Sequence, residues 1–387
     1  MTYKDKQGGK RVNQTIPSSH VGVKINEWYK MIRQFSIPDA EILKAEVEQE
    51  IQQMEEDQDL LIYYSLMCFR HQMMLDYLEP VDKYLHRPTT TELLKKIETS
   101  QKKLSGMLHY YSFLFRGMYE FSKKEYLKAI GFYREAEQQL FHITDDIEQA
   151  EFHFKLAEAY YGMKQSHVSM HHVSKALEIY NQYELYKVRK VQCLFVIAGN
   201  YEDFKCYDKC LPHLEKALEL SNELQNARLI SSALYNIGKC YGEMENFEKA
   251  EKYIEKSVRI SDQAKLNNLP HSMFTLAKYL FKQGKSKCAA EVSNKGLAIA
   301  LQQGDGLFVS LQQYLKALYI DAIDQSGVKN TIQYLEKRKN YSYIEDIALD
   351  TATVFAKANE FEQSHFYYQK MIETQNQIQR GECLYEI

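Results

Sequence analysis

A glutamine stands inside a run of acidic residues at positions 55–59, which reads Glu55-Glu56-Asp57-Gln58-Asp59. Gln58 carries an uncharged amide that both donates and accepts hydrogen bonds. At a connection between two helices, such an amide can enter a partner's cleft and hold a water molecule, as in enzymes that orient an attacking water for phosphoryl hydrolysis. The alternative is structural, because acids at this position stabilise the N-terminus of the next helix. The segment alone leaves both interpretations open.

A second group of polar residues, Asn200, Asp203 and Asn236, has types suited to binding a peptide main chain. Asn200 and Asp203 are three residues apart, so they share a face of a helix. An asparagine amide can pair with both the N–H and the C=O of an extended peptide. Ordinary exposed polarity is the alternative interpretation.

The histidine and cysteine spacings do not indicate a metal site or a reactive thiol. His167 and His171 are one helical turn apart and His172 follows, but no third metal ligand comes at a helical spacing, so we expect no metal site. Cys206 and Cys210 also lie about a turn apart, and Cys210 occupies a packing position. The 7 cysteines show no zinc-type pairing, and residues 1–20 lack a signal peptide, so we expect reduced thiols in the cytoplasm.

The bulk composition narrows the classes of partner. The net charge is -3 and no basic stripe appears, which argues against nucleic acid. No apolar run reaches about 18 residues, so we expect no membrane span. The chain has only 6 Pro and 16 Gly but 30 Tyr and 18 Phe, which favours long helices with aromatic side chains between them. No glycine-rich phosphate loop or Ser/His/Asp arrangement is present, so we expect no self-contained active site.

Internal repeats predict the fold of the larger part of the chain. Small residues recur with a period of about 40, each followed by aromatics and by small residues on a second helix, as in tetratricopeptide repeats. The first-helix positions are Gly117, Ala157, Ala198 or Gly199, Gly238, Ala277, Ala317 and Ala352. We therefore predict an all-α protein with about seven such repeats at 108–387, forming a superhelix with a binding groove.

The first part of the chain does not follow this period. We predict helices at 25–35, 39–56 and 60–78, the first carrying Trp28 and the second an apolar stripe that includes Ile42. These helices form a three-helix bundle at 21–79. A flexible tail at 1–20 precedes the bundle, and a connector helix region at 80–107 follows it.

Long motifs in this sequence resemble the Rap regulators of spore-forming Gram-positive bacteria. The resemblance covers nearly the whole chain after the tail, and its motifs are Val23-Lys-Ile-Asn-Glu-Trp28, Phe35-Ser-Ile-Pro-Asp39, Met54-Glu-Glu-Asp-Gln58, Phe69-Arg70-His71, Arg116-Gly-Met-Tyr-Glu120, Ala150-Glu-Phe152, Ala198-Gly-Asn200 and Gly381-Glu-Cys-Leu-Tyr-Glu386.

This resemblance implies a function for both candidate sites. Rap proteins bind response regulators through the N-terminal bundle; some hydrolyse an aspartyl phosphate, and others block a DNA-binding domain. Gln58 matches the glutamine that enters the phosphate site, and the regulator contacts correspond to Asp57, Leu61, Phe69 and Met107, where Met107 replaces an expected leucine. Short secreted Phr peptides bind the groove, and their main chain is held at the positions of Asn200, Asp203 and Asn236.

We therefore predict a Rap-type response regulator aspartate phosphatase, controlled by a Phr-type peptide. The protein needs no cofactor of its own, since the regulator supplies a divalent metal. The peptide is expected to compress the superhelix and repack the bundle, which hides Leu61, Phe69 and Met107. A non-enzymatic Rap protein that sequesters a DNA-binding domain is the alternative. A peptide-responsive transcription factor is disfavoured, because the second helix is acidic.

Overall fold

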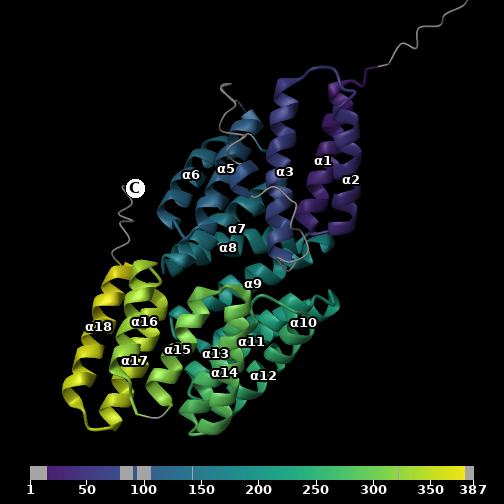
Figure 1. Cartoon of the computed structure of the whole chain (residues 1–387). Coiled ribbons are helices and arrows are strands. Elements are labelled where there is room, and N and C mark those ends of the chain that lie inside the picture. The colour runs from purple at the N-terminus through teal and green to yellow at the C-terminus, as the bar shows by residue number, and fades with distance from the viewer. Residues whose placement is uncertain (1–14, 79–89, 94–105, 142, 321, 380–387) are drawn as a thin grey trace, which may run out of the picture.

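The computed structural model describes residues 15–78, 90–93, 106–141, 143–320 and 322–379, and these residues are almost entirely helical (Figure 1). Three helices come first: α1 (Ser18–Gln34), α2 (Ile37–Ile51) and α3 (Gln58–Leu78). Most of the predicted connector, 80–107, lies outside the described residues, as does the motif at 381–386. None of the described helices is long and apolar enough to cross a membrane.

Seven antiparallel helix pairs follow, which confirms the predicted repeat array. The pairs are α5 (Gly106–Ser122) with α6 (Tyr126–Leu140), α7 (Asp146–Gly162) with α8 (Ser166–Asn181), α9 (Lys187–Asp203) with α10 (Tyr207–Glu223), α11 (Ala227–Glu243) with α12 (Phe247–Gln263), α13 (Leu269–Lys282) with α14 (Ser286–Gln303), α15 (Gly306–Tyr319) with α16 (Gln325–Lys337), and α17 (Tyr341–Lys357) with α18 (Phe361–Gln379).

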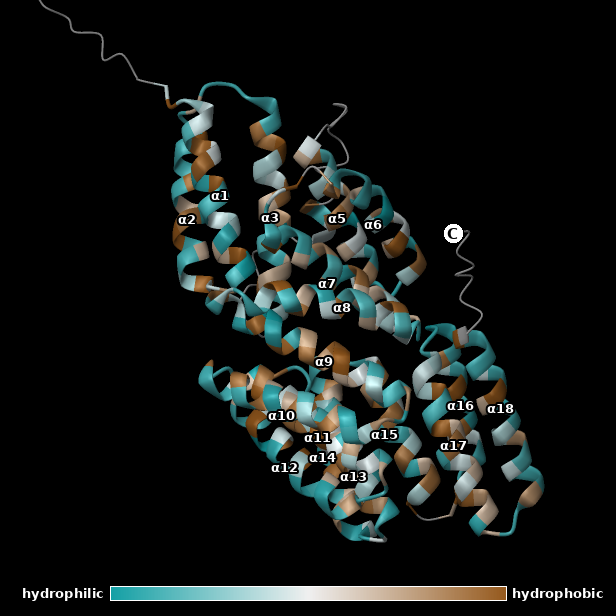
Figure 2. Cartoon of the chain, turned by 180° about the vertical axis from the view of Figure 1, so that it is seen from behind, coloured by the Kyte–Doolittle hydropathy of each residue, from teal (hydrophilic) through white to brown (hydrophobic). Residues whose placement is uncertain are grey.

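The small residues of the repeat pattern lie where paired helices touch. A Cβ atom on Gly117 would come within 2.3 Å of the Tyr133 ring, and one on Gly238 within 2.7 Å of Ile254. These short distances explain why the residues at the crossings are small, since a larger side chain there would push the helix axes apart. In the middle of the array, α9 is buried along much of its length and joins the two halves (Figure 2).

The superhelix returns on itself so that its first and last repeats meet. Figures 1 and 2 both place α16 and α18 next to the ends of α6 and α8. Lys124, in the turn between α5 and α6, donates a 2.7 Å hydrogen bond to Oδ1 of Asn340, which precedes α17. These two residues are 216 positions apart in the sequence. The array therefore makes a closing contact between its ends.

The N-terminal helices differ in detail from their predicted bounds. α1 begins at Ser18, and Ile16 pairs with Met54, so residues 15–20 of the predicted tail are structured. α2 ends at Ile51, and α3 already begins at Gln58. Ile42, predicted in the buried stripe of the second helix, is 58% exposed. α3 packs against both α1 and α5, so the bundle is continuous with the repeat array.

Candidate functional site

The turn between α2 and α3 is fastened to the start of α1. Ile16 donates its N–H to the carbonyl of Gln53 (2.9 Å) and accepts from Glu55 N–H (3.0 Å). The Glu55 carboxylate accepts from the N–H of Ser18, at 2.9 Å, and so satisfies one free N–H in the first turn of α1. The polypeptide chain that carries Gln58 is therefore held by a small hydrogen-bonded patch rather than by a free loop.

Asp57 and Gln58 have different roles within this turn. Oδ1 of Asp57 accepts the N–H of Leu60 at 3.1 Å, which is the geometry of a helix cap. Gln58 is exposed in the first turn of α3, and its Nε2 donates to Oε1 of Glu56 at 2.9 Å. The structural interpretation therefore accounts for Asp57, whereas the Gln58 amide is accessible to a partner.

Met107 lies in an open cavity beside this turn. The cavity has a volume of about 430 Å³ and is lined by Asp57, Met107, Asn26 and Tyr63, among others. Met107 is 41% exposed, and the Tyr63 hydroxyl donates to Oδ1 of Asn26 at 2.6 Å. The structure thus brings two predicted contact residues, Asp57 and Met107, to one hollow surface. Asn26 and Tyr63 belong to the same surface and were not predicted.

Phe69 lies elsewhere and is not a surface residue in this structure. Its side chain is 0% exposed, and its ring stacks on Phe115 of α5 with centroids 6.2 Å apart. Leu61 is half-buried. A partner can reach Phe69 only if α3 separates from α5, because both of the helices that carry these rings are part of one core. The expectation that Leu61, Phe69 and Met107 are hidden together fits Phe69 and does not fit Met107.

The three predicted peptide anchors do not converge in the groove. Asn236 is half-buried and lines a cavity of about 330 Å³ together with Lys239, Glu202 and Tyr161. We call this cavity the groove cavity. Asn200 is fully buried, and its Nδ2 donates to Oγ of Ser169 at 2.9 Å.

Asp203 is also engaged away from that cavity. It accepts from Nζ of Lys164 at 2.5 Å and from Oγ of Ser166 at 2.9 Å. In this structure Asn200 and Asp203 fasten α9 to the preceding repeat, since Ser166 and Ser169 belong to α8. Of the three anchors, only Asn236 faces the groove cavity.

Buried charges join the bundle to the second and third repeats. Arg33 of α1 lies 3.0 Å from Glu148 and 2.7 Å from Asp145. Arg70 of α3 lies 3.3 Å from Glu151, which also accepts from Nη2 of Arg189 at 2.6 Å.

All of these side chains except Asp145 are almost completely buried. Charges removed from water need partners of opposite sign, and each arginine here has one. The network therefore ties the docked position of the bundle to specific ion pairs.

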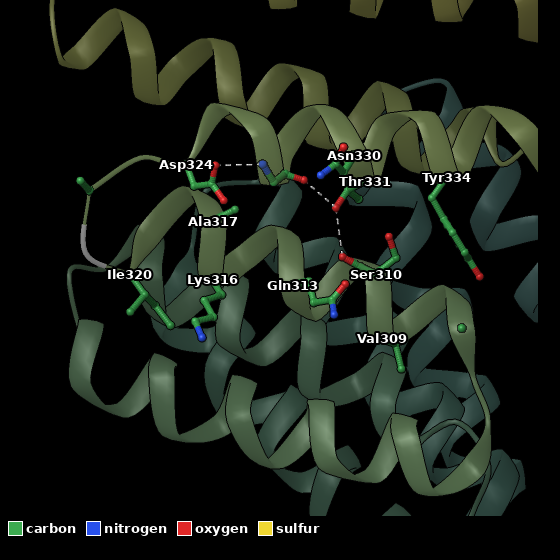
Figure 3. Close-up of a pocket in the computed structure, with 13 residues that line it drawn as sticks. Val309, Ser310, Gln313, Lys316, Ala317, Ile320, Asp324, Asn330, Thr331 and Tyr334 are labelled. Atoms are coloured by element: carbon green, nitrogen blue, oxygen red, sulfur yellow. Dashed lines mark hydrogen bonds between the residues drawn. The ribbon is translucent and has the colours of Figure 1, made fainter.

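Two further places in the structure, a histidine pair and a larger cavity, do not contain the predicted functional groups. Nδ1 of His153 lies 3.1 Å from Nδ1 of His172, but no group of three metal-ligating side chains occurs among the described residues. A cavity of about 620 Å³ between α15 and α16 is lined by none of the predicted regulator-contact or peptide-anchor residues (Figure 3). There, Thr331 donates to the carbonyl of Ser310 at 3.3 Å and fastens the two helices. Cavity size alone does not locate the functional site.

Comparisons with known proteins match both the N-terminal helices and the repeat array. Residues 15–76 match the family model of the N-terminal domain of response regulator aspartate phosphatase H, and residues 192–263 and 229–302 match a tetratricopeptide-repeat model. The chain is 54% identical to response regulator aspartate phosphatase H of Bacillus subtilis (strain 168), over 97% of this chain and 100% of that protein. The chain belongs to the Rap family.

Solved Rap structures differ in how closely they match this conformation. A Rap protein complexed with competence and sporulation factor is 39% identical and superimposes with a TM-score of 0.87, covering 94% of this chain and 99% of that one. The apo form of RapI is 37% identical with the same coverage, but its TM-score is 0.69. At nearly equal identity, the overall conformation of this chain therefore matches the complexed Rap structure more closely than the apo structure.

The Rap motifs contained a signal for the buried network. Arg33, Arg70, His71 and Glu151 all lie in or beside the segments that carry the resemblance. His71 accepts from Trp28 Nε1 at 2.9 Å, so the motif tryptophan is fixed by a motif histidine. The charges in these motifs indicate helix docking, which spacing alone did not reveal.

The groove residues missed by sequence reasoning also had a signal. Glu158 and Lys239 each follow directly after a small packing residue, Ala157 or Gly238. One residue further along a helix is a rotation of about 100°. A charge at that step points away from the helix crossing, and both side chains line the groove cavity.

Docking of the Rap bundle is expected to respond to pH through Glu148. Burial raises the pKa of Glu148 from 4.5 to about 7, and Arg33 opposes this shift only in part. A carboxyl group with a higher pKa in the docked state takes up a proton on docking, so docking weakens as the pH rises from 4.5 through 7. The docked-to-undocked ratio should be about eightfold higher at pH 6 than at pH 7.5.

This pH response can be measured with a fluorescent dye pair on exposed positions of α2 and α8. Glu148→Gln should remove it, while Asp146→Asn, a change at an exposed acid on the same helix, should leave it intact. An unchanged response in Glu148→Gln would assign it to another group.

Proposed function

We propose that this Rap protein hydrolyses the aspartyl phosphate of a bacterial response regulator and that Gln58 orients the attacking water. The observation that carries the proposal is the exposed Gln58 amide at the start of α3, beside the cavity that contains Asp57 and Met107. The 54% identity to response regulator aspartate phosphatase H favours hydrolysis over simple sequestration. The test is the rate of dephosphorylation of a panel of phosphorylated response regulators by the full-length protein.

Hydrolysis of an aspartyl phosphate requires few catalytic groups from this chain. An aspartyl phosphate is a reactive acyl phosphate, so placing a water in line with the phosphorus removes much of the remaining barrier. The side-chain carbonyl of Gln58 would accept a hydrogen bond from an O–H of that water. Its NH2 group would become free to donate once its hydrogen bond to Glu56 opens. The regulator would contribute the divalent metal and the aspartate, and Rap would contribute binding and orientation. We place this activity in the cytoplasm.

A short peptide is the proposed inhibitor, and the described conformation is the proposed inhibited state. The support is the burial of Phe69 against α5 together with the closer match to a complexed Rap structure. A peptide that touches several repeats binds best at one superhelical pitch, and so it shifts the population towards that pitch. The bundle then docks through the Arg33 and Arg70 ion pairs and withdraws part of the surface that the regulator needs.

Asn236→Ala is expected to raise the peptide concentration needed for half inhibition by at least about tenfold. The Asn236 amide lines the groove cavity and makes no side-chain hydrogen bond within the described residues, so it is free to pair with a peptide main chain. The alanine substitution removes this amide. Phosphatase activity without peptide should be unchanged. The exposed Asn222→Ala in the same array is the control. Equal inhibition of both variants would remove Asn236 from the peptide site.

A further inference from the structure

The closing contact between the ends of the superhelix leaves a cavity of about 350 Å³. Its lining comes from both ends of the array: the turns after α5 and α7 on one side, and the turn before α17 with the end of α18 on the other. This cavity shares no residue with the surface around Gln58 or with the groove cavity. It exists only while the two ends lie together.

The cavity is lined by five cationic side chains and one acidic side chain. Lys123, Lys124 and Lys164 come from the early repeats, and Arg338 and Lys339 come from the turn before α17. The acidic residue, Glu125, lies 3.7 Å from Lys128, which is outside the lining. Lys164 is paired with Asp203, and the other four cations have no carboxylate within ion-pair distance among the described residues. The lining therefore has an excess of positive charge from both sides.

Two helix N-termini without side-chain caps open onto the same space. Residues 126 and 127 of α6 and residues 341 and 342 of α17 line the cavity. Neither Glu125 nor Asn340, the residues before these helices, accepts a hydrogen bond from its own first turn. Asparagine is among the strongest helix caps. Here its oxygen is bound to Lys124 instead, which leaves the first N–H groups of α17 available to a ligand.

We propose that this cavity binds a small multivalent anion of the phosphate type, and that the anion stabilises the closed superhelix. Free N–H groups at helix N-termini and surrounding cations are the groups that bind such anions. Because the cations of one side separate from those of the other when the array opens, the closed form binds the anion more tightly. By linkage, an anion at ten times its dissociation constant raises the closed-to-open ratio by up to about elevenfold. The proposal does not depend on phosphatase activity.

The test is calorimetric titration of the full-length protein with inorganic pyrophosphate, at an ionic strength held constant with sodium chloride. Saturable binding of one pyrophosphate per chain is expected. The double variants Lys123→Ala/Lys124→Ala and Arg338→Ala/Lys339→Ala should each weaken binding by at least about tenfold, since each removes one side of the site. Lys337→Ala/Lys357→Ala, which removes two exposed cations of α16 and α17 outside the cavity, should bind as the unaltered protein does.

Small-angle scattering supplies the second readout. Pyrophosphate should lower the mean radius of gyration of the unaltered protein and leave that of both site variants unchanged. Circular dichroism will show whether the variants remain helical. Three results would overturn the proposal: no saturable binding, full binding that survives in either site variant, or an equal loss of binding in the control variant.

Discussion

Gln58→Ala is expected to reduce the rate of regulator dephosphorylation by at least about 100-fold while regulator binding stays within a few-fold of its original strength. Alanine has no group that could hold a water molecule. The substitution should cost little stability, because Gln58 is exposed and its side-chain amide donates to Glu56, a nearby residue of the same turn. The cap of α3 is provided by Asp57 and remains in place.

The measurement is single-turnover loss of phosphate from a phosphorylated regulator, with binding determined separately on the unphosphorylated form. Gln52→Ala is the matched control, since Gln52 is also exposed and is the C-cap residue of the preceding helix, α2. Its rate should not change. Turnover by Gln58→Ala within about threefold of the original rate would exclude the role of water orientation.

Glu151→Gln is expected to lower the free energy of unfolding by about 3–5 kcal/mol at pH 7. Glu151 is 2% exposed and lies between two buried guanidinium groups, those of Arg70 and Arg189. It also accepts a 2.8 Å hydrogen bond from the Tyr180 hydroxyl. Glutamine keeps the size of the side chain but removes the charge, so two cations would remain buried without a counter-ion.

The pH dependence of this contribution follows from the pKa of the carboxyl group. Burial alone would raise that pKa, but Arg189 and Arg70 hold it down at about 2. A lowered carboxyl pKa contributes stability that is complete above the ordinary value of 4.5 and is lost as the pH falls towards 2. The destabilisation by Glu151→Gln should therefore shrink in acid.

Chemical denaturation of the two proteins measures this effect, with Glu137→Gln at an exposed position of α6 as the control. A second substitution, Arg70→Met, should recover part of the stability lost in Glu151→Gln, because it removes one of the two stranded charges. A loss below about 1 kcal/mol, or no recovery in the double variant, would show that the pair does not hold the bundle in place.

Much of the fold was accessible from local patterns. The seven repeats follow from small residues such as Gly117 and Gly238, because a close helix crossing requires a small side chain wherever it occurs. The position of Gln58 near the connection between two helices follows equally from local spacing, although α3 begins at Gln58 itself, and so does the capping role of the adjacent Asp57. The motif around Trp28 was sufficient to indicate the family.

The faces of α3 could not be predicted in the same way. This helix carries apolar residues around most of its circumference, so periodicity does not distinguish the side facing α1 from the side facing α5. Phe69 was predicted at a contact surface, and the structure places it in the shared core with Phe115. Asn200 was predicted in the groove, and its amide instead pairs with Ser169 in the preceding repeat.

The sequence by itself determined the helical repeats, the position of the Gln58 turn and membership of the Rap family, because each depends on residues close together in the chain. Only the tertiary structure decided that the bundle docks through Arg33 and Arg70, and that Lys124 meets Asn340 across 216 residues. These contacts depend on small rotations between successive repeats, which add up over the whole array. The total rotation cannot be read from any local sequence pattern, so only the tertiary structure shows the closed superhelix and its cationic cavity.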